Sequence, residues 1–233
     1  MHYYSQYKQD KFLNTVVLNN KRDGFFIDIG AHDGITFSNS IFFEKYKNYS
    51  GICVEPNPKV FEKLNNNRSC IKINACIGFE PRKANFLAVS GYGEMLSGLL
   101  EFYDAKHLER VDKVIEQHGG TKQIIEVDVI TFNSLLNKVD GAIDFCSIDT
   151  EGNELSILQA INFDNLKINS FTIENNYDNP EIPRILEKNG YIKIYQLSCD
   201  QVFVKRELFD ISMRFRLLKY KLYQKLNRFR SRK

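Results

Sequence analysis

Residues 25–34 read Phe25-Phe26-Ile27-Asp28-Ile29-Gly30-Ala31-His32-Asp33-Gly34. The apolar run that ends at Asp28 predicts a buried strand. Gly30 and Gly34 follow at a spacing that predicts a tight turn against a ligand, because glycine adopts backbone conformations that other residues avoid. The G-x-x-x-G pattern lacks the middle glycine of the dinucleotide fingerprint and the Gly-Lys-Ser/Thr ending of a phosphate loop. The segment therefore predicts a first strand and its ligand loop, with no need for a pyrophosphate cradle.

A second apolar run, residues 51–54, ends in Glu55. In open α/β sheets a carboxylate about twenty residues beyond the glycine turn accepts hydrogen bonds from ribose hydroxyls. Pro56 and Pro58 cannot continue the strand, and Pro58 is well placed to begin a helix. Each half also has a purely structural explanation, because glycines occur in many turns and acidic residues often cap helices. The two halves in this order predict a nucleoside site.

These features resemble the cofactor half of S-adenosylmethionine-dependent methyltransferases. Residues 143–154, which include Ile148-Asp149-Thr150-Glu151-Gly152-Asn153-Glu154, resemble the I-D-x-E-G-x-E segment of the FkbM-type methyltransferase family. Residues 5–10 are similar to the S-Q-x-x-Q-D opening of one branch, and the resemblance covers roughly residues 5–205. It implies an α/β fold with a Rossmann-like class I methyltransferase sheet, mostly parallel with an antiparallel closing strand and with helices on both faces.

The resemblance also implies that S-adenosyl-L-methionine is the cofactor. Asp28 and Glu55 are expected to hold its adenosyl group, and the end of a third strand over residues 70–78 is expected to border the adenine. The full set of expected cofactor contacts is Asp28, Gly30, Ala31, His32, Gly34, Glu55, Pro56, Ala75, Cys76 and Asp149.

Two later apolar runs end in acids, since Asp149 follows residues 145–148 and Glu174 follows residues 170–173. Ligands of open α/β sheets bind outside the carboxyl ends of the strands, so both acids should face the same cleft as the glycine loop. Asp149 is the first candidate for a general base, with His32 and Glu174 as alternatives. The same side chains and Glu151 offer hard oxygen ligands that suit magnesium, although nothing in the sequence requires a metal.

The acceptor side is expected to involve Glu151, Asn175 and Tyr177. Gln9 and Asp10 are expected either to reach over the cleft as part of a lid or to cap the first helix. FkbM resemblance implies O-methylation, and an acidic, asparagine-rich rim without a basic wall favours a hydroxyl of a sugar or glycan. The alternatives are a small natural product as acceptor, a non-catalytic binding or assembly protein with this fold, a nucleotide-sugar oxidoreductase, and methylation of protein or nucleic acid.

The length of 233 residues and the hydrophobic content of 43% predict one α/β domain with a full core. We expect an N-terminal helical lid segment at residues 1–24, the methyltransferase domain at 25–205 and a basic helix at 206–233. An insertion at about 79–123 is assigned to acceptor recognition, the alternative being a loop that covers a sheet edge.

The net charge of +3 hides an asymmetry between the tail and the rest of the chain. Residues 205–233 contain eleven Lys/Arg and two Asp/Glu, whereas the remaining residues contain 21 and 27. Apolar residues recur in the tail at helical spacing, namely Leu208, Ile211, Phe215, Leu218, Leu222, Leu226 and Phe229. This pattern predicts a basic amphipathic helix that packs on the domain, mediates homodimerisation or contacts an anionic membrane peripherally. The acidic body argues against nucleic acid as a partner.

The five cysteines lie in or beside apolar runs without C-x-x-C spacing, which predicts reduced core thiols and no zinc site. The N-terminus has no basic-then-apolar signal, and no apolar run is long enough to cross a bilayer. We therefore expect a cytoplasmic protein that contacts membranes, if at all, through its basic tail.

Overall fold

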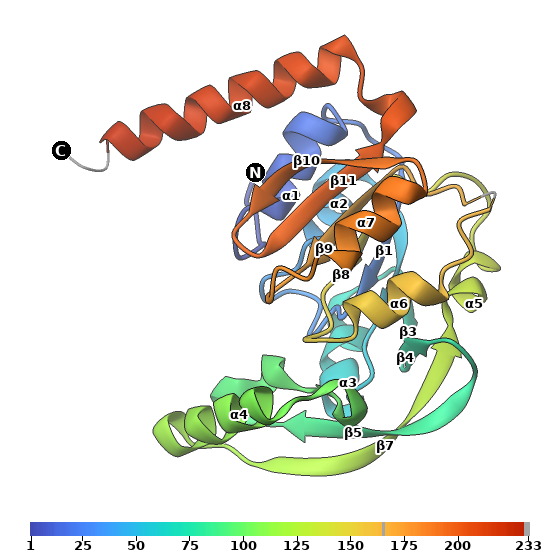
Figure 1. Cartoon of the computed structure of the whole chain (residues 1–233), viewed down its shortest axis with the longest axis vertical. Helices are drawn as coiled ribbons and strands as arrows, with labels where there is room; N and C mark the ends of the chain where they lie inside the picture. The colour runs from blue at the N-terminus through green and yellow to red at the C-terminus, as the bar shows by residue number, and fades with distance from the viewer. Residues whose placement is uncertain (165, 231–233) are drawn as a thin grey trace.

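The computed structural model describes residues 1–164 and 166–230, without the side chains of residues 228–230 (Figure 1). Within this part of the chain the strands form two sheets, a main sheet of seven strands and a second sheet of four. Figure 1 shows the second sheet and its helix α4, Ala105–His118, at one end of the long axis and the C-terminal helix α8, Ile211–Arg230, at the other.

The main sheet has the strand order β10-β11-β9-β8-β1-β2-β3. Strand β1 lies in the interior of the sheet and pairs in parallel with β2 on one side and β8 on the other, while β11 runs antiparallel to both of its neighbours. This arrangement confirms the predicted sheet, mostly parallel with an antiparallel closing strand. The strands are β1 Phe25–Ile29, β2 Ser50–Val54, β3 Ile71–Ile73, β8 Phe145–Ile148, β9 Ser170–Glu174, β10 Tyr191–Leu197 and β11 Asp200–Lys205.

Helices cover both faces of the main sheet, as expected. One face packs Ile27 and Ile29 of β1 against α5, α6 and α7, and the other packs Phe26 against the N-terminal helices, α2, α3 and α8. Successive β1 residues point to opposite faces, so a strand buried on both faces reads as a continuous apolar run. The helices are α1 Gln9–Phe12, its π-helical continuation η1 Leu13–Val17, α2 Ile41–Lys47, α3 Pro58–Asn67, α5 Phe132–Leu136, α6 Glu154–Ala160 and α7 Glu181–Lys188.

The second sheet has the order β4-β7-β5-β6, and its longest ladder joins β5 to β7 in antiparallel register. It has a small core of its own, in which Leu87, Val89, Leu96 and Val111 are buried together. The segment expected to be an insertion is therefore a folded layer rather than a loop over a sheet edge. Its elements are β4 Cys76–Gly78, β5 Arg82–Val89, η2 Gly91–Leu96, β6 Gly98–Leu99, η3 Leu100–Phe102, α4 Ala105–His118 and β7 Lys122–Thr131.

The prediction of a single third strand at residues 70–78 is wrong, because this segment forms two strands that belong to different sheets. Strand β3 pairs with β2, whereas β4 pairs with β7. Asn74 lies at the point of division, where its side-chain amide donates to the carbonyl oxygens of Glu55 at 2.8 Å and Pro56 at 3.0 Å. These bonds hold the chain as it turns from one sheet to the other.

The C-terminal segment forms η4, Arg206–Leu208, and then the 20-residue helix α8, Ile211–Arg230. Its inward residues Met213, Leu217 and Tyr220 join the hydrophobic cluster on one face of the main sheet. The apolar positions that predicted the helix are exposed instead, from Ile211 to Leu226. The side chain of Phe229 and residues 231–233, which belong to the same prediction, lie outside the described residues.

Candidate active site

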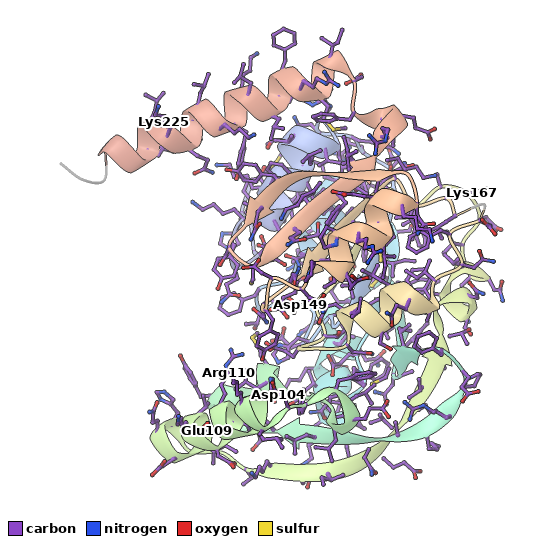
Figure 2. All side chains as sticks on the ribbon, in the orientation of Figure 1. Asp104, Glu109, Arg110, Asp149, Lys167 and Lys225 are labelled. Atoms are coloured by element: carbon purple, nitrogen blue, oxygen red, sulfur yellow. The ribbon has the colours of Figure 1, made fainter. Side chains whose placement is uncertain are left out.

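A cleft of about 1120 Å³, counted with its open mouth, lies at the carboxyl ends of β1, β2 and β8. The second sheet supplies its opposite wall through Phe86, Glu94 and Leu99. Figure 2 shows Asp149 at mid-height, between the main sheet and the end that carries α4.

Gly30 lies where three chain segments meet. The N–H groups of Gly30 and Ala31 both donate to the carbonyl oxygen of Val54 at 3.0 Å. Gly30 has φ +84°, and a Cβ placed on it would lie 1.6 Å from the carbonyl oxygen of Asp149. Only glycine allows the end of β8 to approach this closely while the backbone keeps a positive φ.

Asp28 lines the cleft but its carboxylate is already engaged. The hydroxyl of Ser40 donates to Oδ2 of Asp28 at 2.5 Å, and Arg68 donates to the same hydroxyl at 3.0 Å. Burial raises the pKa of Asp28, and the Ser40 hydrogen bond and the Arg68 charge oppose the rise. Gly34, by contrast, does not line the cleft; a Cβ there would lie 2.6 Å from side-chain atoms of Arg68 and Leu64, so this glycine packs the loop on α3.

Glu55 lines the cleft from the tip of β2, next to Pro56. The backbone N–H of His32 donates to one carboxylate oxygen at 3.1 Å, and the N–H of Asn57 donates to the other at 2.8 Å. Burial raises the pKa of Glu55 to about 7, against the effect of these two donors. Each oxygen keeps a further lone pair, so the oriented carboxylate can accept hydroxyl groups from a ligand.

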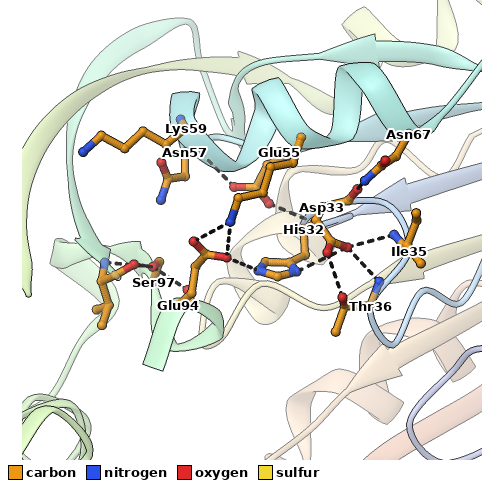
Figure 3. Close-up of polar contacts among 12 residues, drawn as sticks. His32, Asp33, Ile35, Thr36, Glu55, Asn57, Lys59, Asn67, Glu94 and Ser97 are labelled. Carbon is orange, nitrogen blue, oxygen red and sulfur yellow. Dashed lines mark hydrogen bonds and ion pairs between the residues drawn. The ribbon is translucent and has the colours of Figure 1, made fainter. Parts of the chain in front are cut away.

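The ring of His32 connects the β1–α2 loop to the second sheet (Figure 3). Its Nε2 lies 3.0 Å from Oε2 of Glu94 in η2, and both oxygens of Glu94 lie 3.0 Å from Nζ of Lys63 on α3. Nδ1 of His32 is buried and has no hydrogen-bond partner among the described residues, although it lies 3.7 Å from Oδ1 of Asp33. The ring therefore faces Glu94, which sequence reasoning did not identify because the contact crosses from one sheet to the other.

Two buried asparagines line the cleft and were also missed. Asn39 donates its amide to the Ser147 hydroxyl at 3.0 Å, and Asn153 donates its amide to the Ile77 carbonyl at 2.9 Å. The Oδ1 atom of each is buried and has no partner within the described residues. A buried acceptor left unpaired costs about 1–3 kcal/mol, so both oxygens favour a ligand that donates to them. Ala75 and Cys76, expected at the adenine, line the same cleft.

A cluster of acids occupies the side of the cleft formed by β8, β9 and β11. Burial raises the pKa of Asp149 well above its usual range, with further contributions from the charges of Glu174 and Asp200. Burial followed by neighbouring carboxylates likewise raises the pKa of Glu151 to about 8 and that of Glu174 to about 8. Burial raises the pKa of Asp200 to about 6. This side of the cleft therefore holds protons near neutral pH.

The expected metal ligands Asp149, Glu151 and Glu174 are all in this cluster. No group of three or more His, Cys, Asp or Glu within residues 1–164 and 166–230 is arranged to hold a metal ion. Oε2 of Glu174 is buried without a hydrogen-bond partner in the described part of the chain.

A second cavity of about 720 Å³, counted with its open mouth, shares Glu151 and Glu174 with the cleft. Asn175 and Tyr177, which we expect on the acceptor side, also line it. The amide of Asn175 is engaged by the backbone of Asn179, to which it donates at 3.0 Å and from which it accepts at 2.7 Å. Tyr177 is 66% exposed at the rim.

The opposite wall of this cavity comes from the second-sheet layer. Tyr103 and His107 line it, with their rings stacked at 3.8 Å between centroids.

Gln9 and Asp10 have different environments. Gln9 lines the cleft, and its amide donates to Oδ2 of Asp200 at 2.6 Å. The Asp10 carboxylate is buried elsewhere and accepts hydrogen bonds from the N–H of Tyr4 at 2.6 Å and the hydroxyl of Ser5 at 2.6 Å. Asp10 therefore fixes the N-terminal turn, and we assign it no role in the cleft.

Comparison with solved structures gives distant similarities. The chain is similar to a methyltransferase from Pyrococcus furiosus, with 15% identity and a TM-score of 0.39 over 88% of each chain. It is similar to precorrin-6y C5,15-methyltransferase from Geobacter metallireducens GS-15, with 14% identity and a TM-score of 0.41 over 84% of each chain. Similarity to human methyltransferase 10 domain containing protein has 10% identity and a TM-score of 0.41, over 84% of this chain and 80% of that one.

Comparison by sequence gives the family. No curated protein matches the chain. Residues 28–193, well over half of the chain, match the Methyltransferase FkbM domain, and this range includes the β1 loop, Glu55, Asp149 and Glu174. The chain therefore belongs to the FkbM methyltransferase domain family.

Proposed function

We propose that this protein is an S-adenosyl-L-methionine-dependent O-methyltransferase that acts on a hydroxyl group of a sugar or glycan. The observation that carries the proposal is the contact between Gly30 and the Asp149 carbonyl. This contact places the loop that would hold the methyl donor next to the acids that would take up the acceptor's proton. Donor binding and proton removal would then take place in one cleft.

The residues of the cleft fit this cofactor. S-adenosylmethionine presents hydrogen-bond donors at its ribose diol, its adenine amino group and its ammonium group. The cleft presents acceptors, namely the Glu55 carboxylate and the unpaired Oδ1 atoms of Asn39 and Asn153. Ala75 and Leu99 add apolar wall for an aromatic base. When bound, the cofactor supplies a methyl group on a positively charged sulfur.

We assign Glu55 to the ribose diol. Its two oxygens are oriented by the N–H groups of His32 and Asn57, so little conformational freedom is lost when hydroxyls bind. Ala31, His32 and Pro56 line the cleft beside it. The ion pair of Glu94 with Lys63, together with the contact between Glu94 and the His32 ring, then holds the second-sheet wall over the same site.

We assign Asp149 as the general base. An alcohol must lose its proton as the new carbon–oxygen bond forms, and a base whose pKa lies near the working pH does this best. Burial and the neighbouring carboxylates move the pKa of Asp149 upward, in that direction. Glu174, with a pKa of about 8, is the alternative base and the nearest means of passing the proton on.

The second cavity supports a carbohydrate acceptor. Glu151, Asn176 and Tyr177 offer acceptors and donors for hydroxyl groups, and the stacked Tyr103 and His107 rings offer an aromatic surface. Among the described residues its lining includes no Lys or Arg, the side chains that most often bind phosphate, and the nearby Arg110 is already paired with Glu151 at 3.7 Å. The acceptor is therefore proposed to be a neutral sugar rather than a phosphorylated one.

The test is to incubate the protein with a labelled methyl donor and a panel of glycans, neutral sugars and hydroxylated natural products, and to locate the label by mass spectrometry. We expect the label on a sugar hydroxyl in the wild type and none in Asp149→Asn. Label on natural products alone would replace the proposed substrate class. Cofactor binding without transfer to any hydroxyl in the panel would contradict the proposal.

A further inference from the structure

Helix α8 carries two apolar faces. Met213, Leu217 and Tyr220 are buried against the domain. A second stripe is 53–72% exposed and consists of Ile211, Phe215, Leu218, Leu222 and Leu226. Because an α-helix turns about 100° per residue, the two sets lie on nearly opposite sides of α8. The exposed stripe is therefore not needed to hold the helix on its own domain.

The inward face fixes the orientation of the helix. The Tyr220 ring packs edge-on against Phe12 at 5.0 Å and against Tyr195 at 5.7 Å between centroids. Nε of Arg216 donates to the carbonyl oxygen of Val16 at 2.8 Å. These contacts hold α8 on the N-terminal helices with the exposed stripe directed outward.

The charge of α8 selects the kind of partner. Residues 211–230 contain seven Lys/Arg and no Asp/Glu. On the helical turn, Arg214, Lys221 and Lys225 border one side of the exposed stripe and Lys219 borders the other. A second copy docked through this stripe would bring two purely basic helices together, which like charges oppose. An anionic lipid surface accepts both features, since it attracts the basic borders and receives the apolar stripe.

The position of the helix agrees with such a partner. Figures 1 and 2 show α8, with Lys225 towards its far end, at the end of the molecule opposite α4 and away from Asp149. Its 20 residues form a rod of about 30 Å. No helix in the described part of the chain combines the length and apolar character needed to cross a bilayer.

We propose that α8 is a docking surface for an anionic membrane, on which the helix lies in the plane of the interface with its exposed apolar stripe towards the acyl chains. The leucines enter the interface, and the flanking lysines reach the charged headgroups. This proposal is independent of the methylated substrate.

The test uses the full-length chain in co-sedimentation with vesicles of phosphatidylcholine, with and without phosphatidylglycerol. We expect binding to the anionic vesicles only, weakened by salt. The double variant Leu218→Glu/Leu222→Glu should lose it. Lys219→Gln/Lys225→Gln should weaken it by about fivefold for each charge removed. Phe79→Glu, at a side chain that is 61% exposed on a loop away from α8, is the matched control and should bind normally.

Three results would overturn the proposal. The first is no binding to anionic vesicles by the wild type, and the second is equal binding to neutral vesicles. The third is a wild-type protein that does not bind vesicles but forms a dimer in sedimentation velocity, together with a Leu218→Glu/Leu222→Glu variant that is monomeric. That result would assign the stripe to contact with a second copy of the chain. Cofactor titration and circular dichroism of each variant establish that it is folded.

Discussion

The two sides of the cleft use the same kind of side chain in different ways. At the tips of β1 and β2, Asp28 and Glu55 receive hydrogen bonds from Ser40 and from backbone N–H groups. At the tips of β8 and β9, burial raises the pKa values of Asp149 and Glu174, and the charges of neighbouring carboxylates add to the rise. Equivalent positions in one sheet thus provide fixed acceptors on one side and proton carriers on the other, because neighbouring donors and charges set the role of a carboxyl group.

Gly30→Ala should have the largest effect on cofactor binding and stability, because it would push the glycine loop after β1 away from the end of β8. The new methyl group would overlap the Asp149 carbonyl, so we expect no measurable cofactor binding and a loss of about 2–4 kcal/mol in the free energy of unfolding. Gly190→Ala is the matched control, since Gly190 has φ +86° and nothing within 4 Å of its added Cβ. It should cost only about 1–2 kcal/mol in urea unfolding. Equal costs for the two variants would show that the close approach is unimportant.

Asp149→Asn should affect the proton-accepting side of the cleft and leave the cofactor-binding side intact. Loss of the base should lower kcat about 10²–10⁴-fold, while the dissociation constant of the cofactor changes by no more than about threefold. Steady-state kinetics and calorimetry measure the two quantities on the same preparation. Asp128→Asn, at an exposed acid on β7, is the control and should match the wild type. Normal turnover in Asp149→Asn would remove it as the base.

Glu55→Gln should have the reverse effect of Asp149→Asn, weakening cofactor binding rather than turnover. Losing charged hydrogen bonds to the ribose diol should weaken cofactor affinity about 10–100-fold and leave turnover at saturating cofactor largely intact. Because the pKa of Glu55 is about 7, wild-type affinity should rise as pH increases through that value, and the glutamine variant should lose this dependence. Glu94 lies on the opposite wall of the cleft, where it is paired with Lys63 and the His32 ring rather than assigned to the ribose, so Glu94→Gln should cost less. Calorimetry measures the cofactor affinity of Glu55→Gln. An affinity equal to that of the wild type would exclude Glu55 as the residue that binds the ribose diol.

Glu174→Gln should produce the smallest change, a shift in the pH profile. The base must be deprotonated to act, and the negative charge of Glu174 raises the pKa of Asp149. Removing that charge should lower the pKa of Asp149 and move the rising limb of kcat/KM about one unit to lower pH. Glu187→Gln, an exposed acid on α7, should leave the limb unchanged. A limb that stays in place or moves upward would show that the two carboxyl groups are not coupled through charge.

The strand tips could be predicted from the sequence because parallel strands end at one edge of their sheet. This rule places Asp28, Glu55, Asp149 and Glu174 at a common opening, and all four side chains line the cleft. Local sequence could not reveal the Glu94 contact to His32, since it depends on how the second sheet folds against the first.

Other predictions were wrong because the sequence pattern is compatible with two different structures. The apolar run at residues 70–78 is long enough for one strand, and only pairing with β7 draws Cys76–Gly78 into the other sheet. Gln9 and Asp10 are adjacent, but a helix turns about 100° per residue, so one reaches the cleft and the other does not. Both faces of α8 are apolar, and the less obvious one packs on the domain.

A crystal structure with S-adenosylhomocysteine bound tests the central claim most directly. We expect the Glu55 carboxylate within about 2.5–3.0 Å of the ribose 2′- and 3′-hydroxyls, and the sulfur directed towards Asp149 and Glu174. A ligand bound elsewhere, or a Glu55 side chain turned away from the ribose, would contradict the division of the cleft into a donor side and a proton-accepting side.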